Sequence, residues 1–463
     1  MKKTKILCTI GPASEKEGTI KKMVEAGMDA ARINTSHGTL AEYREKIKTI
    51  RKIANIPVLM DTSGPQIRLV SRKRTELKKG STVKAGFSPK KNLFFSKNFF
   101  SEIKTGKRIL LSDGLAELKV VKKDRGKKEL TLRALNGITL KGNMHANIPS
   151  VYLDIPILSA RDKRAIKLAK KMDVDFISLS FTRRKDDVIK ARKLLRGSGV
   201  GVIAKIENSE GVQKIDSIIS AADGIMVARG DLGMEIPSER VPLVQKEIVR
   251  KCNQAGKTAI IATQMLASMV SSARPTRAET SDVANAILDG ADCIMLSNET
   301  AVGNYPVKAV EEMKRIALET EPFVRHRVQS RKLHGIPDTV SKSIYGISKH
   351  LPVKKIIAIT KSGFTAKMIS RFKPKQEIIA VTNNPCVERK LKIVYGVNPL
   401  LMEKIPEKKK IARVAEKCHK KGLLKKNELV AFTAGIYLAE EPSSNAIQLH
   451  KVSDLLSHAR RRH

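Results

Sequence analysis

The sequence has no tryptophan, only five cysteines in 463 residues, and no long apolar run. The cysteines lie far apart with no C-x-x-C pair, which argues against a disulfide framework or a zinc site and is typical of a reducing compartment. No apolar stretch approaches the roughly 20 residues that cross a bilayer, and the amino-terminal residues lack the apolar segment of a signal peptide. These absences predict a cytoplasmic protein without a membrane-spanning segment.

Acidic residues are also scarce relative to basic ones. The chain has 89 Lys and Arg against 46 Asp and Glu, a net charge of +43. Such a surface attracts polyanions of any kind, nucleic acid included. Aromatic residues, however, make up only 4% of the chain and offer few stacking platforms for bases. We therefore expect at most non-specific, salt-sensitive binding to nucleic acid, and the charge alone assigns no function.

Short β-rich runs alternate with amphipathic helical stretches along most of the chain, which predicts an α/β fold. A turn-rich and very basic β segment interrupts this pattern between Arg68 and Asn147, and a second α/β region follows the resumed alternation. Eight barrel strands are predicted at Lys5–Thr9, Ala30–Asn34, Pro57–Met60, Phe176–Ser180, Gly201–Lys205, Gly224–Val227, Thr258–Thr263 and Cys293–Leu296.

Eight β/α units are the number that closes a parallel barrel. The predicted architecture is therefore a parallel (β/α)8 TIM barrel with an inserted small β-barrel domain and a C-terminal α/β domain. The expected boundaries are 1–67 and 149–325 for the two parts of the barrel, 68–148 for the inserted domain and 326–463 for the last domain.

Polar side chains follow the predicted barrel strands, and the carboxyl ends of barrel strands are where functional groups sit. Lys205 and Glu207 alternate along one extended segment and so point the same way, while Asp231 follows the next strand. Two carboxylates suit Mg²⁺ or Mn²⁺, and Arg32 and Arg68 could each donate two hydrogen bonds to phosphate oxygens. Each residue alone is more typical of a structural ion pair. Together they predict metal-assisted chemistry on a small phosphorylated anion.

Seven segments resemble, in the same order, motifs of the pyruvate kinase family. The resemblance covers most of Thr4 to Leu400 and is weakest in the inserted domain and after Met402. The segments are Thr4–Ser14, Arg32–Gly38, Ile203–Gly211, Asp223–Gly233, Ala262–Leu266, Arg274–Glu279 and Met295–Ala301. The resemblance implies transfer of phosphate from phosphoenolpyruvate to ADP, giving pyruvate and ATP in the final step of glycolysis, by a homotetramer.

The same resemblance implies a role for each residue at the strand ends. It places the divalent metal on Glu207 and Asp231, and it makes Lys205 the residue that stabilises the transition state. The other catalytic and substrate-binding residues that it implies are Arg32, Ser180, Gly230, Asp231 and Thr263. Either Thr263 or a water protonates the enol. The implied nucleotide contacts are Asn34, Thr35, Ser36, His37 and Arg68, and the implied K⁺ ligands are Asn34, Ser36, Asp61 and Thr62.

The inserted domain would be the lid that closes over the nucleotide and excludes water. Here the chain departs from the family pattern, because Met144 to Asn147 stand where Lys-Gly-Val-Asn is usual. Lys141 is close enough in sequence to replace the missing lysine, and the nucleotide preference stays open. Gln66 stands where K⁺-dependent members have Glu and independent ones Lys, but the oxygen ligands are present and favour K⁺ use.

The segment Thr360–Ala366 leads from a predicted strand into a helix. It is either a phosphate pocket for an allosteric effector, as in the family, or an ordinary helix start capped by Ser or Thr. The acidic segment Leu438–Pro442 disfavours a bisphosphate such as fructose 1,6-bisphosphate.

Two other functions are compatible with parts of the sequence. A metal-dependent lyase or aldolase acting on pyruvate enolate would also pair Glu with Asp around Mg²⁺, but it would need neither Lys205 nor the Arg32–His37 segment nor a lid. A nucleic-acid-binding protein would explain the net charge and would release its ligand steeply as the salt concentration rises.

Overall fold

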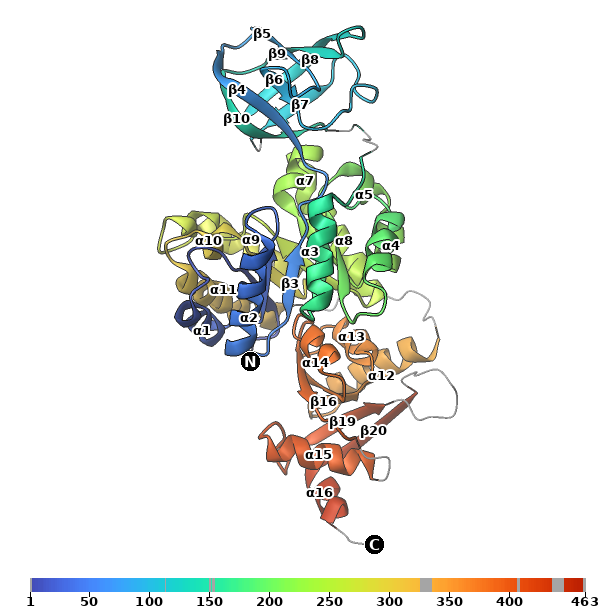
Figure 1. The fold of residues 1–463 in the computed structure, drawn as a ribbon. Coiled ribbons are helices and arrows are strands. Elements are labelled where there is room, and N and C mark those ends of the chain that lie inside the picture. Colours follow the sequence, from blue (N-terminus) through green and yellow to red (C-terminus); the bar gives the residue numbers. More distant parts are fainter. Residues whose placement is uncertain are drawn as a thin grey trace.

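The computed structural model describes residues 2–112, 114–149, 151, 155–324, 335–405, 409–434 and 445–460. Three parts follow one another along a single axis, with the inserted β domain at one end, the barrel in the middle and the C-terminal α/β domain at the other end (Figure 1). The predicted fold class is confirmed. The boundaries after residues 67, 148 and 325 stay predictions.

The barrel is a closed parallel sheet with the strand order β1-β15-β14-β13-β12-β11-β3-β2. All eight predicted strands are present, with ends shifted by one residue at most. They are β1 (Lys5–Thr9), β2 (Ala30–Asn34), β3 (Val58–Asp61), β11 (Phe176–Leu179), β12 (Gly201–Ile206), β13 (Gly224–Ala228), β14 (Thr258–Ala262) and β15 (Cys293–Leu296).

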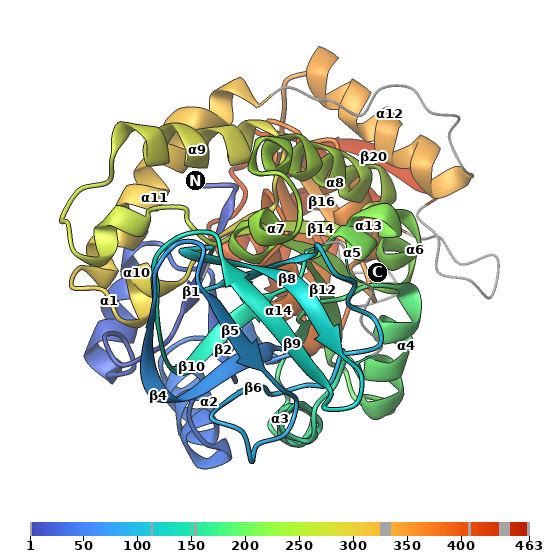
Figure 2. The ribbon, with the colours of Figure 1, turned by 90° about the horizontal axis from the view of Figure 1, so that it is seen from above.

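Helices form a ring around this sheet (Figure 2). They are α1 (Glu17–Ala26), α2 (Leu40–Ile53), α3 (Ala160–Lys171), α4 (Lys185–Leu194), α5 (Ser209–Gln213), α6 (Ile215–Ala221), α7 (Arg229–Glu235), α8 (Val241–Ala255), α9 (Arg277–Leu288), α10 (Asn298–Ala301) and α11 (Pro306–Thr320), with short 3-10 turns at Ser238–Arg240, Ala267–Val270 and Glu321–Phe323.

Val202, Ala204 and Ile206 of β12 belong to the core beneath these helices, and Ile203 belongs to the core inside the barrel. Because side chains alternate along a strand, Lys205 points into the barrel interior.

Aspartates fix the amino ends of the barrel strands. Asp29, Asp175, Asp223 and Asp292 directly precede β2, β11, β13 and β15. Each carboxylate accepts the backbone N–H of a residue on the neighbouring strand, at 2.7 to 2.9 Å. The C-terminal domain packs against this end, where the Lys5 ammonium donates to the Val397 carbonyl at 2.8 Å. The amino end of the barrel is therefore a structural interface.

The inserted β domain is an antiparallel sheet with the order β5-β9-β8-β7-β10-β4-β6. Its strands are β4 (Ile67–Leu77), β5 (Thr82–Ala85), β6 (Leu93–Phe95), β7 (Arg108–Leu111), β8 (Ala116–Asp124), β9 (Glu129–Ala134) and β10 (Ile138–Asn147). A bridge between Gly86 and Phe94 brings the two edges of the sheet together, so the domain is nearly a closed barrel. The paired strands β4 and β10 carry the chain out of the barrel and back, and the domain projects over the barrel (Figure 2).

The C-terminal domain has the sheet order β18-β17-β16-β19-β20. Its elements are α12 (Ile336–His350), β16 (Val353–Ile359), α13 (Phe364–Ser370), β17 (Glu377–Thr382), α14 (Pro385–Leu391), β18 (Val397–Leu401), α15 (Lys410–Lys420), β19 (Leu429–Ala434), β20 (Ala446–Lys451) and α16 (Val452–Arg460). The sequence predicts four strands here, at Ile356–Thr360, Glu377–Val381, Leu429–Phe432 and Ala446–Leu449, and all four are present. It does not reveal β18, an edge strand that contains Pro399 and therefore lacks a strand signature. Leu438–Pro442 lies outside the described residues.

No helix in the described parts of the chain is long and apolar enough to cross a bilayer. All five cysteines carry free thiols, and Cys386 is the one that is not buried.

Candidate functional site

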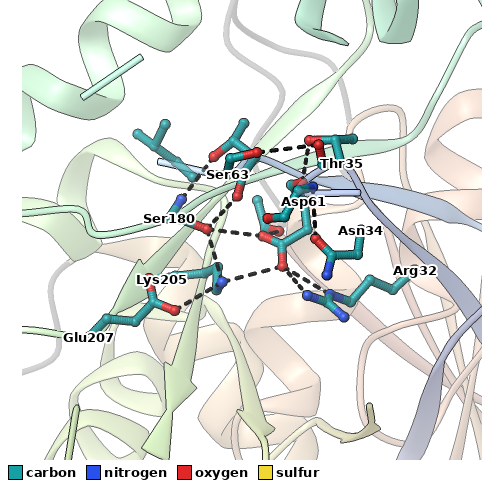
Figure 3. Close-up of polar contacts among 12 residues, drawn as sticks. Arg32, Asn34, Thr35, Asp61, Ser63, Ser180, Lys205 and Glu207 are labelled. Atoms are coloured by element: carbon teal, nitrogen blue, oxygen red, sulfur yellow. Dashed lines mark hydrogen bonds and ion pairs between the residues drawn. The ribbon is translucent and has the colours of Figure 1, made fainter. Parts of the chain in front are cut away.

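The Lys205 ammonium lies at the centre of a polar cluster at the carboxyl end of the barrel (Figure 3). Its Nζ is 2.9 Å from Glu207 Oε1 and 3.2 Å from Asp61 Oδ2, and it donates to Ser180 Oγ at 2.9 Å. Only 8% of the residue is exposed. Burial lowers the pKa of Lys205, but the Asp61 and Glu207 carboxylates outweigh burial and the net shift is upward. The site thus holds a permanent cation away from bulk water.

Asp61, at the end of β3, orients the two cations of the cluster. Its Oδ2 accepts from Arg32 Nε at 2.9 Å as well as from Lys205, and its Oδ1 accepts from the Ser178 hydroxyl. Arg32 also donates through Nη1 to the Thr9 hydroxyl at 2.9 Å. Burial raises the pKa of Asp61, but Lys205 and Arg32 outweigh it and hold the pKa below its usual range. Arg32 and Lys205 are therefore fixed beside each other by one buried anion.

Glu207 and Asp231 are the two carboxylates that the sequence predicts as metal ligands. Glu207 is almost fully buried, and its Oε2 accepts the backbone N–H of Phe181 at 2.6 Å. Burial, with Asp231 and Asp61 nearby, raises the pKa of Glu207 to about 7. The described residues include no group of three or more His, Cys, Asp or Glu that could hold a metal ion. The donors fit a Mg²⁺ ion held by two carboxylates, with substrate and water oxygens completing its shell.

Thr263 and Gly230 lie together on neighbouring strand ends. Thr263 follows β14, Gly230 lies in the first turn of α7, and the Gly230 N–H donates to Thr263 Oγ1 at 2.8 Å. A Cβ at position 230 would lie 3.5 Å from the same hydroxyl, which is an ordinary van der Waals contact, so space alone does not require glycine there. The predicted substrate-binding residues of these two strands are thus adjacent.

The predicted nucleotide and K⁺ residues lie on the loop after β2 and at the end of β3. Asn34 Oδ1 accepts the Ser36 N–H at 3.0 Å, and Thr62 Oγ1 accepts the Ser180 N–H at 3.0 Å. The Thr35 hydroxyl is fully buried and donates to the Asp61 carbonyl at 2.7 Å, so its side chain shapes the loop.

Two exposed or partly exposed residues remain from the predicted nucleotide set. His37 is exposed, and Arg68 donates to Gln66 Oε1 at 3.1 Å. In the inserted domain, His145 lies opposite Arg68 across the β4–β10 ladder, and Met144 lies opposite Leu69. Lys141 sits at the irregularity between Leu140 and Gly142 and is exposed.

The loop after β2 is held by two residues that the sequence did not reveal. Arg161 of α3 donates to the Thr35 carbonyl at 2.7 Å and to the Tyr43 hydroxyl at 2.6 Å, and Tyr43 in turn donates to the Thr35 carbonyl at 3.0 Å. Arg161 lies 126 positions from Thr35, and no local pattern connects the two.

A cleft lies beside the cluster and not on it. It separates the β4–β10 connection from the barrel and is lined by Gln66, His145, Asn147, Phe181 and Glu235, among others. Lys205, Arg32 and Thr263 do not line it. We take the cluster as the chemical centre because the converging charges lie there, and the cleft as the space between the two domains.

The segment Thr360–Ala366 forms a tight turn before α13. The Gly363 N–H donates to the Thr360 hydroxyl at 2.9 Å, and the Phe364 N–H donates to the Ser362 hydroxyl at 3.4 Å. These bonds shape the turn, but the N-cap residue of α13 is Gly363 and no side chain caps the helix, so the expected Ser or Thr cap is not present. Effector binding at this turn stays a prediction.

Comparison with known proteins gives one consistent result. Residues 1–310 match the barrel domain of pyruvate kinase, and residues 338–450 match its alpha/beta domain. The pyruvate kinase of Geobacillus stearothermophilus is 42% identical over 98% of this chain and 81% of its own length. The pyruvate kinases of Sporosarcina psychrophila and Staphylococcus aureus are 42% and 41% identical, over 99% and 98% of this chain and 82% and 81% of their own lengths.

Proposed function

Because the chain belongs to the pyruvate kinase family, enzymes that transfer phosphate from phosphoenolpyruvate to ADP, we propose that the cluster around Lys205 carries out this transfer. The observation that supports the proposal most strongly is the placement of the Lys205 ammonium between the Asp61 and Glu207 carboxylates and beside Arg32. The metal-dependent lyase alternative gains no support from the comparisons.

Lys205 and Arg32 supply the positive charge that the transferring phosphoryl group needs. During transfer, the bond between phosphorus and the enol oxygen breaks as a bond to the terminal oxygen of ADP forms, and negative charge spreads over the phosphoryl oxygens. Fixed cations in a water-poor site stabilise that charge without reorganising. A divalent metal held by Glu207 and Asp231 would neutralise further charge on phosphoryl and enolate oxygens when bound.

Thr263 and the amino-terminal turn of α7 hold the carboxylate end of the substrate. The Gly230 and Asp231 backbone N–H groups start a helix, where an anion is stabilised. The Thr263 hydroxyl accepts the Gly230 N–H at 2.8 Å, which fixes this hydroxyl beside the first turn of α7, where we assign the substrate carboxylate. Protonation of the enolate carbon then gives pyruvate, with Thr263 or a water as the proton donor.

The nucleotide lies between the loop after β2 and the inserted domain. Asn34, Ser36, His37 and Arg68 are the side chains that we assign to ADP, with Lys141 in place of the usual lid lysine. K⁺ would bind near Asn34, Ser36, Asp61 and Thr62, although the Asp61 carboxylate already binds two cations. We assign the protein to the final step of glycolysis, to the cytoplasm and to a homotetrameric state, which light scattering can test.

A coupled assay with phosphoenolpyruvate, ADP, Mg²⁺ and K⁺ tests the function directly. We expect ATP and pyruvate in equal amounts. Pyruvate without ATP, or no turnover with any nucleoside diphosphate and any divalent metal, would contradict the proposal. Titration of K⁺ and a panel of nucleotides in the same assay test the K⁺ site and the nucleotide preference.

A further inference from the structure

The turn that presents Thr263 to the site has an unusual backbone. Two consecutive non-glycine residues, Thr263 and Gln264, have positive φ values of 69° and 54°. This left-handed region is disfavoured for L-residues, and most of all for a β-branched one such as threonine. The turn therefore persists only if its surroundings hold it.

The Arg229 guanidinium binds this turn. Its Nη2 donates to the Thr263 carbonyl at 2.8 Å and to the Gln264 carbonyl at 3.0 Å, and its Nε donates to the Thr263 carbonyl at 3.3 Å. Only 9% of Arg229 is exposed, so these contacts are largely shielded from water. Both carbonyls of the left-handed turn thus bind one side chain from the neighbouring strand end.

The guanidinium is itself anchored from the far side. Its Nη1 forms an ion pair with Asp282 Oδ1 of α9 at 2.7 Å and approaches Gln245 Oε1 of α8 at 3.5 Å. A planar group that donates in three directions can tie a turn, a strand end and two helices together, whereas an ammonium has no such fixed fork. The anchoring makes the position of the turn depend on Arg229.

Arg229 and Gly230 both form hydrogen bonds with Thr263. The side chain of Arg229 binds the Thr263 carbonyl, while the N–H of the next residue, Gly230, binds the Thr263 hydroxyl at 2.8 Å. The direction of the hydroxyl is set by the backbone that carries it, so a shift of the turn moves Thr263 Oγ1 relative to Lys205 and the α7 turn.

We propose that Arg229 is a positioning residue for the transfer reaction, which acts by locking the strained Thr263–Gln264 turn so that the Thr263 hydroxyl points at the substrate. Arg229 itself does not touch the substrate in this proposal. The inference rests on the proposed function, because the role of Thr263 does.

The first test compares Arg229→Lys, Thr263→Ala and the double variant. We expect Arg229→Lys to lower kcat/KM for phosphoenolpyruvate by about 10-fold to 100-fold, the loss typical of a misplaced group, with KM for ADP unchanged. We expect the double variant to be no slower than Thr263→Ala, because both changes disable one group. Activity of Arg229→Lys within twofold of the parent, or losses that multiply in the double variant, would overturn the proposal.

Arg371→Lys is the matched control. Arg371 is equally buried and also binds a carbonyl, that of Gln254 at 2.9 Å, and a carboxylate, that of Asp338 at 2.7 Å, but it lies in the C-terminal domain. A similar loss of thermal stability in both variants, with a loss of kcat/KM only in Arg229→Lys, separates positioning from folding. Equal kinetic losses in the two would refute the proposal.

Gln264→Gly supplies a rescue that a merely structural arginine would not show. Glycine adopts a positive φ without strain, so the turn needs less help. In the Arg229→Lys background we expect Gln264→Gly to recover part of the lost kcat/KM, and no recovery would count against the mechanism. If the parent protein makes no ATP, the proposed function is wrong. If the parent protein makes ATP but the Arg229 variants behave otherwise than expected, only the role of Arg229 is wrong.

Discussion

The two ends of the barrel both carry buried charges, but they use them differently. At the amino end, each aspartate has a backbone N–H and at least one cation, as Asp292 has the Ala259 N–H and Lys373, and Asp175 has the Val58 N–H with Arg51 and Arg389. At the carboxyl end, the Asp61 and Glu207 carboxylates share the Lys205 ammonium, Asp61 also binds Arg32, and Asp231 adds a further negative charge nearby.

The pKa shifts express the same contrast. Burial raises the pKa of Asp223, but the Val202 N–H and Arg192 outweigh it and the net shift is downward. At the other end, burial raises the pKa of Glu207 and of Glu235 to about 7. Ion pairs that are complete within the chain stabilise the fold, whereas charges left partly uncompensated are characteristic of a site that awaits a ligand. Burial alone does not distinguish the two.

Lys205→Met should produce the largest effect. We expect turnover to fall about 10²-fold or more, because a preorganised charge is removed, while the melting temperature falls only modestly, because Arg32 still pairs with Asp61 and the Glu207 carboxyl, whose pKa is about 7, can take up a proton. Steady-state kinetics and thermal unfolding on the same preparation measure both. Near-normal turnover would mean that the carboxyl-end cluster is as structural as the amino-end pairs.

Lys373→Met is the counterpart at the amino end. Lys373 forms a buried ion pair with Asp292 at 2.7 Å, and losing it leaves an uncompensated carboxylate. We expect a loss of about 2–3 kcal/mol in the free energy of unfolding, at the low end for a broken buried pair because the Ala259 and Tyr395 N–H groups remain. Turnover per folded molecule should persist. A denaturant titration measures the free energy of unfolding, and the coupled assay measures turnover. A loss of turnover without a loss of stability would mean that the two ends of the barrel do not differ in the proposed way.

Glu207→Gln should raise the concentration of Mg²⁺ that gives half-maximal rate by about tenfold or more, because an ionised ligand becomes neutral. Glu210→Gln is the control. Glu210 is also buried and lies three residues away, but it is paired with Lys214 at 2.7 Å. An unchanged metal requirement in Glu207→Gln, or the same rise in both variants, speaks against Glu207 as a ligand.

The smallest effect is an opposite dependence of stability on pH at the two ends. The pKa of Asp223 is lowered on folding, so its contribution is present at neutral pH and is lost as the pH falls below about 4. Asp223→Asn should therefore destabilise the protein at pH 7, and the difference from the parent should shrink at acid pH.

Glu235 should behave in the reverse way. Burial raises its pKa from 4.5 to about 7, so its contribution to stability is fully present below about 4.5 and is lost as the pH rises through 7. Glu235→Gln should gain on the order of 1 kcal/mol over the parent at pH 8 and nothing at pH 4.5. Thermal unfolding in metal-free buffer, with the exposed Glu239→Gln as control, measures it. A gain that is the same at both pH values would exclude the titration of Glu235 as its cause.

Local patterns in the sequence predicted most elements closely. Gly27 ends α1 in the way that a local glycine signal indicates, with a φ of 125° and an N–H that donates to the Met23 and Val24 carbonyls. The edge strand β18 escaped prediction because Pro399 interrupts its strand signature. Residues that act through distant partners escaped too. Nothing near Arg161 in the sequence indicates that it holds the Thr35 loop, and nothing near Arg229 indicates a left-handed turn at Thr263.

The chain by itself determined the alternation of strands and helices, the eight-fold count that closes the barrel, and the residue types at each strand end, because hydrophobic period and motif order are local properties. Only the tertiary structure decided which charges meet. Whether a carboxylate is satisfied depends on donors that arrive from segments 100 or more positions away, such as Lys205 at Asp61, and on the water that folding removes between them. For that reason Asp292 and Glu207 are both acidic residues next to a barrel strand, yet Asp292 pairs with Lys373, whereas Glu207 shares Lys205 with Asp61 and has a raised pKa.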